Sequence, residues 1–260
     1  MATEEKPAKD GARIRDVPAV TRAVSILRLL GKTSSPLTLK VISEELGLVT
    51  STALHILRAL VAEDLVSVDV ETKRYSLGVG MLTLAKSVIE RNPFPTLVQP
   101  MLDQVSEDWG LTTIGVEVSG LEHMVVLALS RSHTPFSLHV DVGSRFPALI
   151  SATGRLVAAY SAASPKELER KFKALRWDKA PDFEVWSAEV EAVRKKGFSI
   201  DRNNYITGVV VIAIPVLDRL GRMTHSLVAA GMAEGLSVTQ GQQVAKQLQG
   251  HAASLTQFLA

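Results

Sequence analysis

The chain has 260 residues, of which 46% are hydrophobic and 22% are charged, a balance that is typical of globular proteins and excludes a disordered chain. Its 29 Lys and Arg residues nearly balance 27 Asp and Glu residues, so the formal net charge of +2 gives no global sign of a nucleic-acid partner. The absence of cysteine excludes a disulfide framework, thiolate catalysis and metal sites built on cysteine.

The length is enough for one large domain or two ordinary ones. No apolar run approaches the roughly 20 residues that span a bilayer. Residues 1–16 are polar, with mixed charges, and lack the apolar segment of a signal peptide. We therefore expect a cytoplasmic protein without a membrane partner.

The N-terminal third predicts a small helical unit behind a flexible basic arm. Residues 1–17, the arm, show no hydrophobic periodicity. Helical spacing with glycine stops, followed by β-type runs, predicts helices over 18–31, 37–46 and 50–64 and strands over 65–70 and 74–77. This order, with a three-residue turn after Gly47, is the layout of a winged helix-turn-helix, which we assign to residues 18–78.

The remainder predicts a linker and a second domain. An amphipathic segment up to Arg91, followed by Asn92-Pro93-Phe94-Pro95, indicates a linker and dimerisation helix within residues 79–95. Strands and helices then mix without strict alternation over residues 96–260, which favours an α+β fold. The predicted strands are 111–118, 124–129, 136–142, 209–216 and 223–230, and the predicted helices are 98–109, 151–163, 165–175, 183–196 and 237–259.

The third predicted helix has a polar face that suits DNA. Its period turns Ala53, Leu57 and Leu60 inward and leaves Ser51, His55 and Arg58 outside, with Thr52 beside them. No acidic residue occurs over residues 49–62. Hydroxyl, imidazole and guanidinium groups donate to phosphates and base edges. The alternative is an ordinary solvated face of a helical bundle.

Local charge supports the DNA interpretation. Residues 6–32 contain seven basic and two acidic side chains, a net charge of +5. A basic arm can enter a minor groove, and the tip of the strand pair can touch phosphate, although a solubilising tail is the alternative for the arm. The predicted DNA contacts are Arg13, Arg15, Arg22, Thr50, Ser51, Thr52, His55, Arg58, Lys73 and Arg74.

Short motifs follow one another in order along residues 18–259. They are AVTRAVSIL (19–27), PLTL (36–39), ISEELGL (42–48), STA (51–53), YSLG (75–78), GSRFP (143–147), SATGR (151–155), KGFSID (196–201) and IAIPV (212–216). Each has low specificity, but the ordered set resembles the IclR-type transcriptional regulators. The resemblance implies a ligand-responsive, DNA-binding regulator of a metabolic, typically catabolic, operon, and a homodimer that pairs into tetramers.

Two positions depart from the family pattern. The family usually has arginine where this chain has His55, and often a basic residue where it has Thr50. A mostly neutral imidazole does not read guanine bidentately as arginine does. We therefore expect Arg58 and the arm to supply more of the affinity.

The C-terminal domain resembles the family's effector domain, a curved antiparallel sheet with flanking helices. Independently of the family, the small residues 151–154 open a helix whose free N–H groups and dipole can bind a carboxylate. The resemblance adds Asp201 and Val211. Valine where the family often has cysteine favours a hydrophobic or aromatic effector over a very small oxoacid. The predicted effector residues are Ser151, Ala152, Thr153, Gly154, Asp201 and Val211.

Alternatives remain for these residues and for the whole chain. Val211 could simply pack in the core, and Asp201 could cap a turn. The histidines lack metal-ligand spacing, and no nucleophile elbow or phosphate-binding loop is present, so we expect no catalytic residue, no metal and no cofactor. The competing functions are an architectural or interaction protein without effector response, and an enzyme that uses the C-terminal pocket.

Overall fold

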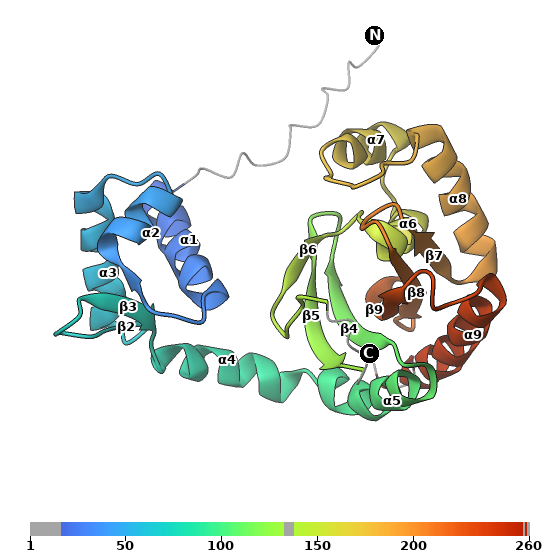
Figure 1. The fold of residues 1–260 in the computed structure, drawn as a ribbon, viewed down its shortest axis with the longest axis horizontal. Coiled ribbons are helices and arrows are strands. Elements are labelled where there is room, and N and C mark those ends of the chain that lie inside the picture. Colours follow the sequence, from blue (N-terminus) through green and yellow to red (C-terminus); the bar gives the residue numbers. More distant parts are fainter. Residues whose placement is uncertain (1–16, 133–137, 257, 259–260) are drawn as a thin grey trace, which may run out of the picture. The chain divides into compact units, whose positions relative to one another are not determined.

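The computed structural model of the chain describes residues 17–132, 138–256 and 258 (Figure 1). The chain divides into two compact units between Asn92 and Pro93, and each unit is described by itself. Helices and antiparallel strands mix in the pattern of an α+β protein, which confirms the predicted fold class. The predicted arm lies outside the described residues, apart from Val17 at the start of the first helix.

The N-terminal unit consists of helices packed around a small apolar core and closed by a short sheet. Three helices supply most of the core, in which Ile26, Ile42 and Leu57 are fully buried. The strands pair antiparallel in the order β1-β3-β2. The elements are α1 (Pro18–Lys32), β1 (Leu37–Thr38), α2 (Leu39–Glu45), α3 (Thr50–Ala62), β2 (Val66–Val68), β3 (Arg74–Leu77) and α4 (Gly80–Arg91).

A sharp turn sets α3 across α2. Gly47 lies in the left-handed region with φ of 60°, and the N–H of Leu48 donates to the carbonyl of Ser43.

No single helix in the described part of the chain is long and apolar enough to span a membrane. The pair α2 and α3 reaches that length and composition together, but it is bent by 114°.

Close backbone contacts fix the start of α4 to the end of α3. The N–H of Gly80 donates to the carbonyl of Asp64, and the N–H of Gly78 donates to the carbonyl of Leu65. A Cβ atom on Gly78 would lie 2.1 Å from the Asp64 oxygen, so only glycine fits there. The start of α4 is therefore held against residues 64 and 65, which follow α3.

The C-terminal unit is built on a six-stranded antiparallel sheet in the order β6-β5-β4-β9-β8-β7. Helices cover both faces (Figure 1). The elements are α5 (Phe94–Trp109), β4 (Thr112–Ser119), β5 (His123–Ser130), β6 (Arg145–Pro147), α6 (Ser151–Tyr160), α7 (Pro165–Lys173), α8 (Phe183–Lys196), β7 (Ser199–Arg202), β8 (Val209–Leu217), β9 (Met223–Met232) and α9 (Val238–Leu255).

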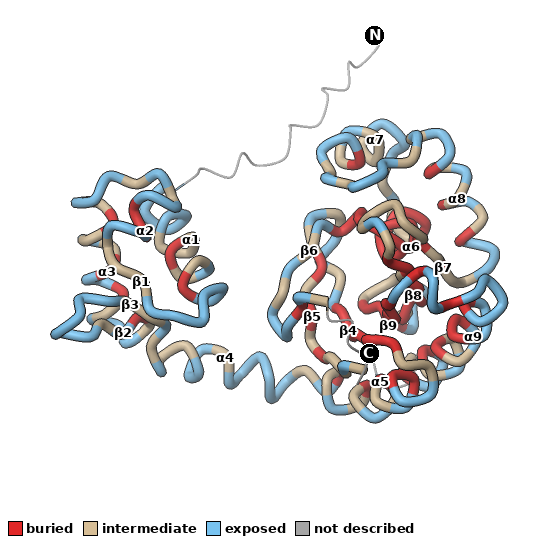
Figure 2. The backbone as a smooth tube through the Cα atoms, viewed as in Figure 1, coloured by how far each residue is buried: buried red, intermediate tan, exposed pale blue. Residues whose placement is uncertain are grey.

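Each face of this sheet has its own core. Along β8, Ile212 and Ile214 pack toward α5 and α9, whereas Ala213 between them packs toward α6 and α8. This alternation follows the two-residue period of a strand. Figure 2 shows buried residues concentrated in the central strands and in α6, while α4 carries none. The antiparallel sheet with flanking helices that the resemblance implies is therefore present.

The predicted strand over 136–142 is wrong for its described part, residues 138–142, which form no strand. The edge of β5 pairs instead with β6, so that Met124 lies opposite Phe146. Beyond β6, the N–H of Val126 donates to the carbonyl of Ser144 and the N–H of Gly143 to that of Val126. The backbone N–H and carbonyl of Val126 are therefore used by residues 143 and 144 and are not open to residues 138–142.

Candidate nucleic-acid interface and ligand cavity

The outer face of α3 has the composition that its period predicts. Ser51, His55 and Arg58 are exposed, and Ala53 and Leu57 on the opposite face are fully buried. Leu57 and Leu60 fasten α3 to the core of the unit, which holds the polar face in solvent. The fold thus presents three hydrogen-bonding side chains along one side of a helix.

The N-terminus of α3 is uncapped. The N-cap position is Val49, which offers no side-chain oxygen to the first-turn N–H groups, and no acidic residue lies in this turn. Thr50, Ser51 and Thr52 supply hydroxyl groups at the same end. Free N–H groups and the positive end of the helix dipole favour a phosphate. The three hydroxyls therefore do not cap the helix, and they lie at the end of α3 that favours an anion.

The turn between β2 and β3 is held by Asp69. Its Oδ1 atom accepts the N–H groups of Thr72 at 2.8 Å and Glu71 at 2.9 Å. The hydrogen bond from Thr72 is the largest of the causes that lower the pKa of Asp69 below its ordinary value. Lys73 takes a left-handed conformation with φ of 56°. The exposed tip is therefore ordered by its own hydrogen bonds.

The other predicted DNA contacts lie in different places. Arg22 is exposed on α1, and Lys73 is exposed at the wing tip. Arg74 is exposed too, but its Nη1 atom donates to the carbonyl of Pro36 at 3.1 Å and so ties β3 to the segment before β1. Arg13 and Arg15 lie outside the described residues.

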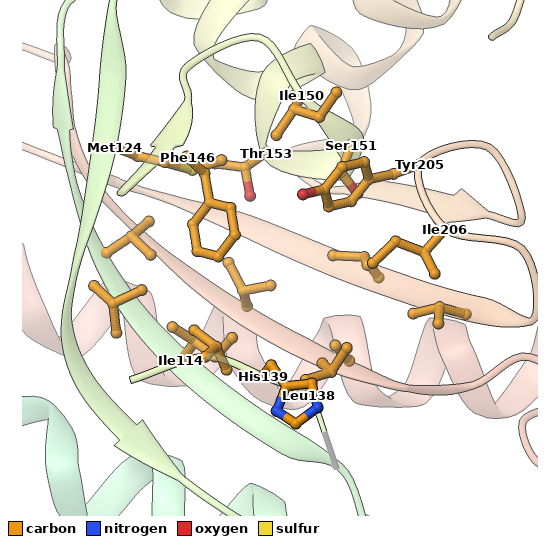
Figure 3. Close-up of a pocket in the computed structure, with 17 residues that line it drawn as sticks. Ile114, Met124, Leu138, His139, Phe146, Ile150, Ser151, Thr153, Tyr205 and Ile206 are labelled. Carbon is orange, nitrogen blue, oxygen red and sulfur yellow. The ribbon is translucent and has the colours of Figure 1, made fainter. Parts of the chain in front are cut away.

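The C-terminal unit contains a cavity of about 400 Å³ between the sheet and the start of α6 (Figure 3). Its walls are mainly aliphatic side chains from β4, β5, β8 and β9, with the aromatic rings of His139, Phe146 and Tyr205. The lining residues are Ile114, Val116, Met124, Val126, Leu138, His139, Val140, Phe146, Ile150, Ser151, Thr153, Tyr205, Ile206, Val209, Val211, Val228 and Ala230.

One end of this cavity is polar. Ser151 and Thr153 face it from the first turn of α6, and Tyr205 lies beside Ser151 (Figure 3). Thr153 is only 2% exposed. Its hydroxyl has no hydrogen bond to any described residue, and the N-cap residue Ile150 gives α6 no side-chain cap. An unused hydroxyl and an uncapped helix start therefore point into an otherwise apolar space.

The predicted effector residues divide into two groups. Ser151, Thr153 and Val211 line the cavity. Ala152 and Gly154 are fully buried but do not line it. A Cβ atom on Gly154 would lie 2.0 Å from the carbonyl atoms of Leu149, so this glycine lets α6 pack closely on the preceding backbone.

Asp201 does not line the cavity either, because its carboxylate is engaged in the protein interior. It accepts hydrogen bonds from Asn204 Nδ2 at 2.9 Å and from the N–H of Tyr205 at 3.0 Å. Arg155 Nη1 donates to the same oxygen as Asn204, Oδ1, at 3.1 Å, and Ser151 Oγ donates to the same oxygen as Tyr205, Oδ2, at 3.4 Å. Asp201 thus joins two walls of the cavity from behind.

Sequence reasoning missed the roles of Arg155 and Tyr205. Arg155 is the one charged residue in the apolar stretch over 148–159, and it follows Ser151 by one helical turn. A lone charge in such a stretch indicates a buried partner, although not which one. Tyr205 gives no such sign, because it reaches the cavity through a loop. Burial raises the pKa of Tyr205 above its ordinary value.

The described residues contain no group of three or more His, Asp or Glu side chains that could hold a metal ion.

Comparisons with known proteins match both units. The sequence model for the "IclR helix-turn-helix domain" matches residues 19–70, and that for "Bacterial transcriptional regulator IclR C-terminal" matches residues 86–257. The glycerol operon regulatory protein of Streptomyces griseus is 26% identical over 226 residues, which cover 85% of this chain and 87% of that protein.

Solved structures agree with the fold. An IclR transcriptional regulator from Alicyclobacillus acidocaldarius superposes with a TM-score of 0.80 at 25% identity, covering 95% of this chain and 100% of that one. An IclR homologue from Microbacterium hydrocarbonoxydans, complexed with 4-hydroxybenzoate, superposes with a TM-score of 0.76 at 18% identity, covering 93% and 98%.

Proposed function

The chain belongs to the IclR family of transcriptional regulators, and on this premise we propose that it controls a catabolic operon in response to a small organic effector. Membership makes it a DNA-binding regulator with a helix-turn-helix. The cavity in the C-terminal unit is the observation that carries the effector response. Because its target is DNA, we place its action in the cytoplasm.

The operator contacts that we propose centre on α3. Ser51, His55 and Arg58 would read base edges, while Thr50 and Thr52 would bind phosphate with the uncapped helix start. Contacts to the phosphate backbone of the DNA would come from basic residues that flank α3, because neutralising phosphates supplies most of the non-specific affinity for DNA. These flanking residues are Arg13, Arg15, Arg22, Lys73 and Arg74.

The effector that we propose is an organic acid with an apolar or aromatic body. The polar end, with Thr153 and the start of α6, suits a carboxylate, and the aliphatic walls suit the rest of the molecule. Val211 contributes an apolar surface. The 4-hydroxybenzoate in the related structure belongs to this chemical class, which supports the assignment.

Self-association is part of the proposal. The helix α4 has no buried residue, although it carries large apolar side chains. Leu82, Val88 and Ile89 are each at least 65% exposed. An isolated helix of this length is only marginally stable in water, so a second copy would cover these side chains. A dimer also supplies two reading heads for a two-part operator, and the family pattern extends this to a tetramer.

Two measurements together test the function. Small molecules that co-purify with the native protein are identified by mass spectrometry, and operator affinity is then measured by fluorescence anisotropy with and without each compound. We expect an organic acid that changes operator affinity and raises the Tm. Specific operator binding that no co-purified or added organic acid alters would contradict effector control.

A further inference from the structure

A buried ion pair lies directly behind the polar end of the cavity. The side chains of Arg155 and Asp201 are 2% and 1% exposed, and Arg155 Nη1 lies 3.1 Å from Asp201 Oδ1. Arg155 Nη1 also donates to the carbonyl of Ser151 at 3.1 Å, and Nε donates to Glu189. Burying two charges is costly, so a pair in this position calls for an explanation.

The arrangement of hydrogen bonds directs Asp201 away from any ligand. Its carboxylate receives donors from Arg155, Asn204, Tyr205 and Ser151. Of these donors, Ser151 and Tyr205 line the cavity, whereas Asp201 does not. Asp201 therefore fixes two cavity walls and has no oxygen left over for a guest molecule.

The charge of Asp201 nevertheless affects the cavity. Its Oδ2 atom lies 3.4 Å from Ser151 Oγ, which lines the polar end. In a poorly solvated interior, an unpaired carboxylate at this distance would repel an anion at the start of α6. The guanidinium of Arg155 cancels this repulsion without entering the cavity.

We propose that Arg155 is a positioning residue that fits the cavity to an anionic ligand. It neutralises Asp201 and holds the backbone of Ser151, whose φ of 58° is unfavourable for a residue other than glycine. The polar end then offers N–H and O–H donors, and the negative charge of Asp201, which contacts Ser151, is paired with Arg155. The second carboxylate on Arg155, that of Glu189, is 45% exposed to solvent. The proposal rests on the proposed effector role of this cavity and adds the residue that sets its charge preference.

The first test needs no ligand. Because the chain has no cysteine, Thr153→Cys places a single thiol at the polar end, and thiolate absorbance at 240 nm reports its pKa. We expect this pKa to lie below the ordinary value of about 8.5, because the helix start favours the thiolate. Adding Arg155→Met should raise it by about 1–3 units, since Asp201 is then unpaired.

Two further variants separate electrostatics from damage to the fold. Asp201→Asn, added to Arg155→Met, removes both buried charges and should return the thiol pKa to its low value. Arg155→Lys keeps the charge and should also keep the pKa low. The titratable residues that line the cavity, His139 and Tyr205, stay unchanged in every variant. A thiol pKa that is the same with arginine and methionine at position 155 would overturn the proposal.

The second test uses ligand pairs. Benzoate, 4-hydroxybenzoate and octanoate are compared with their amides by calorimetry. Arg155→Met should lower the preference for acid over amide at least tenfold, whereas a merely structural loss would weaken both equally. Arg194→Met is the control, because this arginine donates to the carbonyl of Ala159 in α6 and pairs with no carboxylate at the cavity. If no acid binds the wild type, the proposed effector class fails, and the thiol titration still decides the role of Arg155.

Discussion

The phenyl ring of Phe94 stacks on the imidazole of His225, with ring centroids 4.1 Å apart and planes inclined by 24°. Phe94 is the first residue of α5 and is fully buried. His225 lies on β9 and is 9% exposed. The contact therefore anchors the first turn of the C-terminal unit to the middle of its sheet.

Acid should weaken this anchor. Burial lowers the pKa of His225 from 6.5 to about 4, so the folded protein holds the ring neutral. Between these two values the unfolded chain binds a proton that the folded chain does not, and stability falls as the pH decreases through this window. The shift corresponds to about 3 kcal/mol of unfolding free energy, lost fully only below pH 4.

Urea unfolding between pH 7 and pH 4, followed by tryptophan fluorescence, measures this loss. His225→Phe should remove most of the decline, while His139→Asn, at an exposed site, should leave it in place. A smaller part of the decline in stability should remain in this variant, because burial also lowers the pKa of His251. An unchanged pH dependence in His225→Phe would show that His225 is not responsible.

Arg58→Ala should weaken binding to the operator by about 1–3 kcal/mol, because the variant loses a guanidinium contact to a base or phosphate. Anisotropy on an operator selected from random DNA by the wild type gives the affinity. Arg170→Ala on α7 removes the same charge from an exposed site in the other unit and should have little effect. Equal affinity of Arg58→Ala and wild type would remove Arg58 from the interface.

Gly78→Ala should loosen the junction between α3 and α4. The added Cβ would lie 2.1 Å from the Asp64 oxygen, and relieving such overpacking typically costs about 1–3 kcal/mol. Hydrogen exchange should show reduced protection over residues 62–82. Gly31→Ala is the matched control, because its nearest contact, Leu77 Cδ1, lies at 3.4 Å. Unaltered protection in Gly78→Ala would mean that the junction adapts without strain.

Thr153→Val should weaken effector binding while preserving the shape of the cavity. The lost hydroxyl donor to a carboxylate corresponds to about 1.5–3 kcal/mol. Calorimetry with the effector identified from the native protein measures the change, and Thr207→Val, at an exposed position, serves as the control. Full affinity in Thr153→Val would place the carboxylate elsewhere in the cavity.

Much of the fold follows from local sequence. Periodicity and glycine stops place α1, α3 and α8 within two residues of their observed ends, because helix signals repeat over several turns. Short strands give no such signal. The sequence does not predict β1, β6 or β7, which have two, three and four residues. The equally short β2 and β3 are predicted because a turn separates two adjacent apolar runs.

The net charge of +2 conceals the DNA-binding function, but the sequence by itself determined the polar face of α3, since a helical period decides locally which side chains share a face. Only the tertiary structure decided the role of Asp201. Its partner Arg155 lies 46 residues earlier, and whether a carboxylate meets a ligand or a guanidinium depends on which distant elements pack together. The local sequence around Asp201 does not predict that pairing, because burial is a property of the assembled fold.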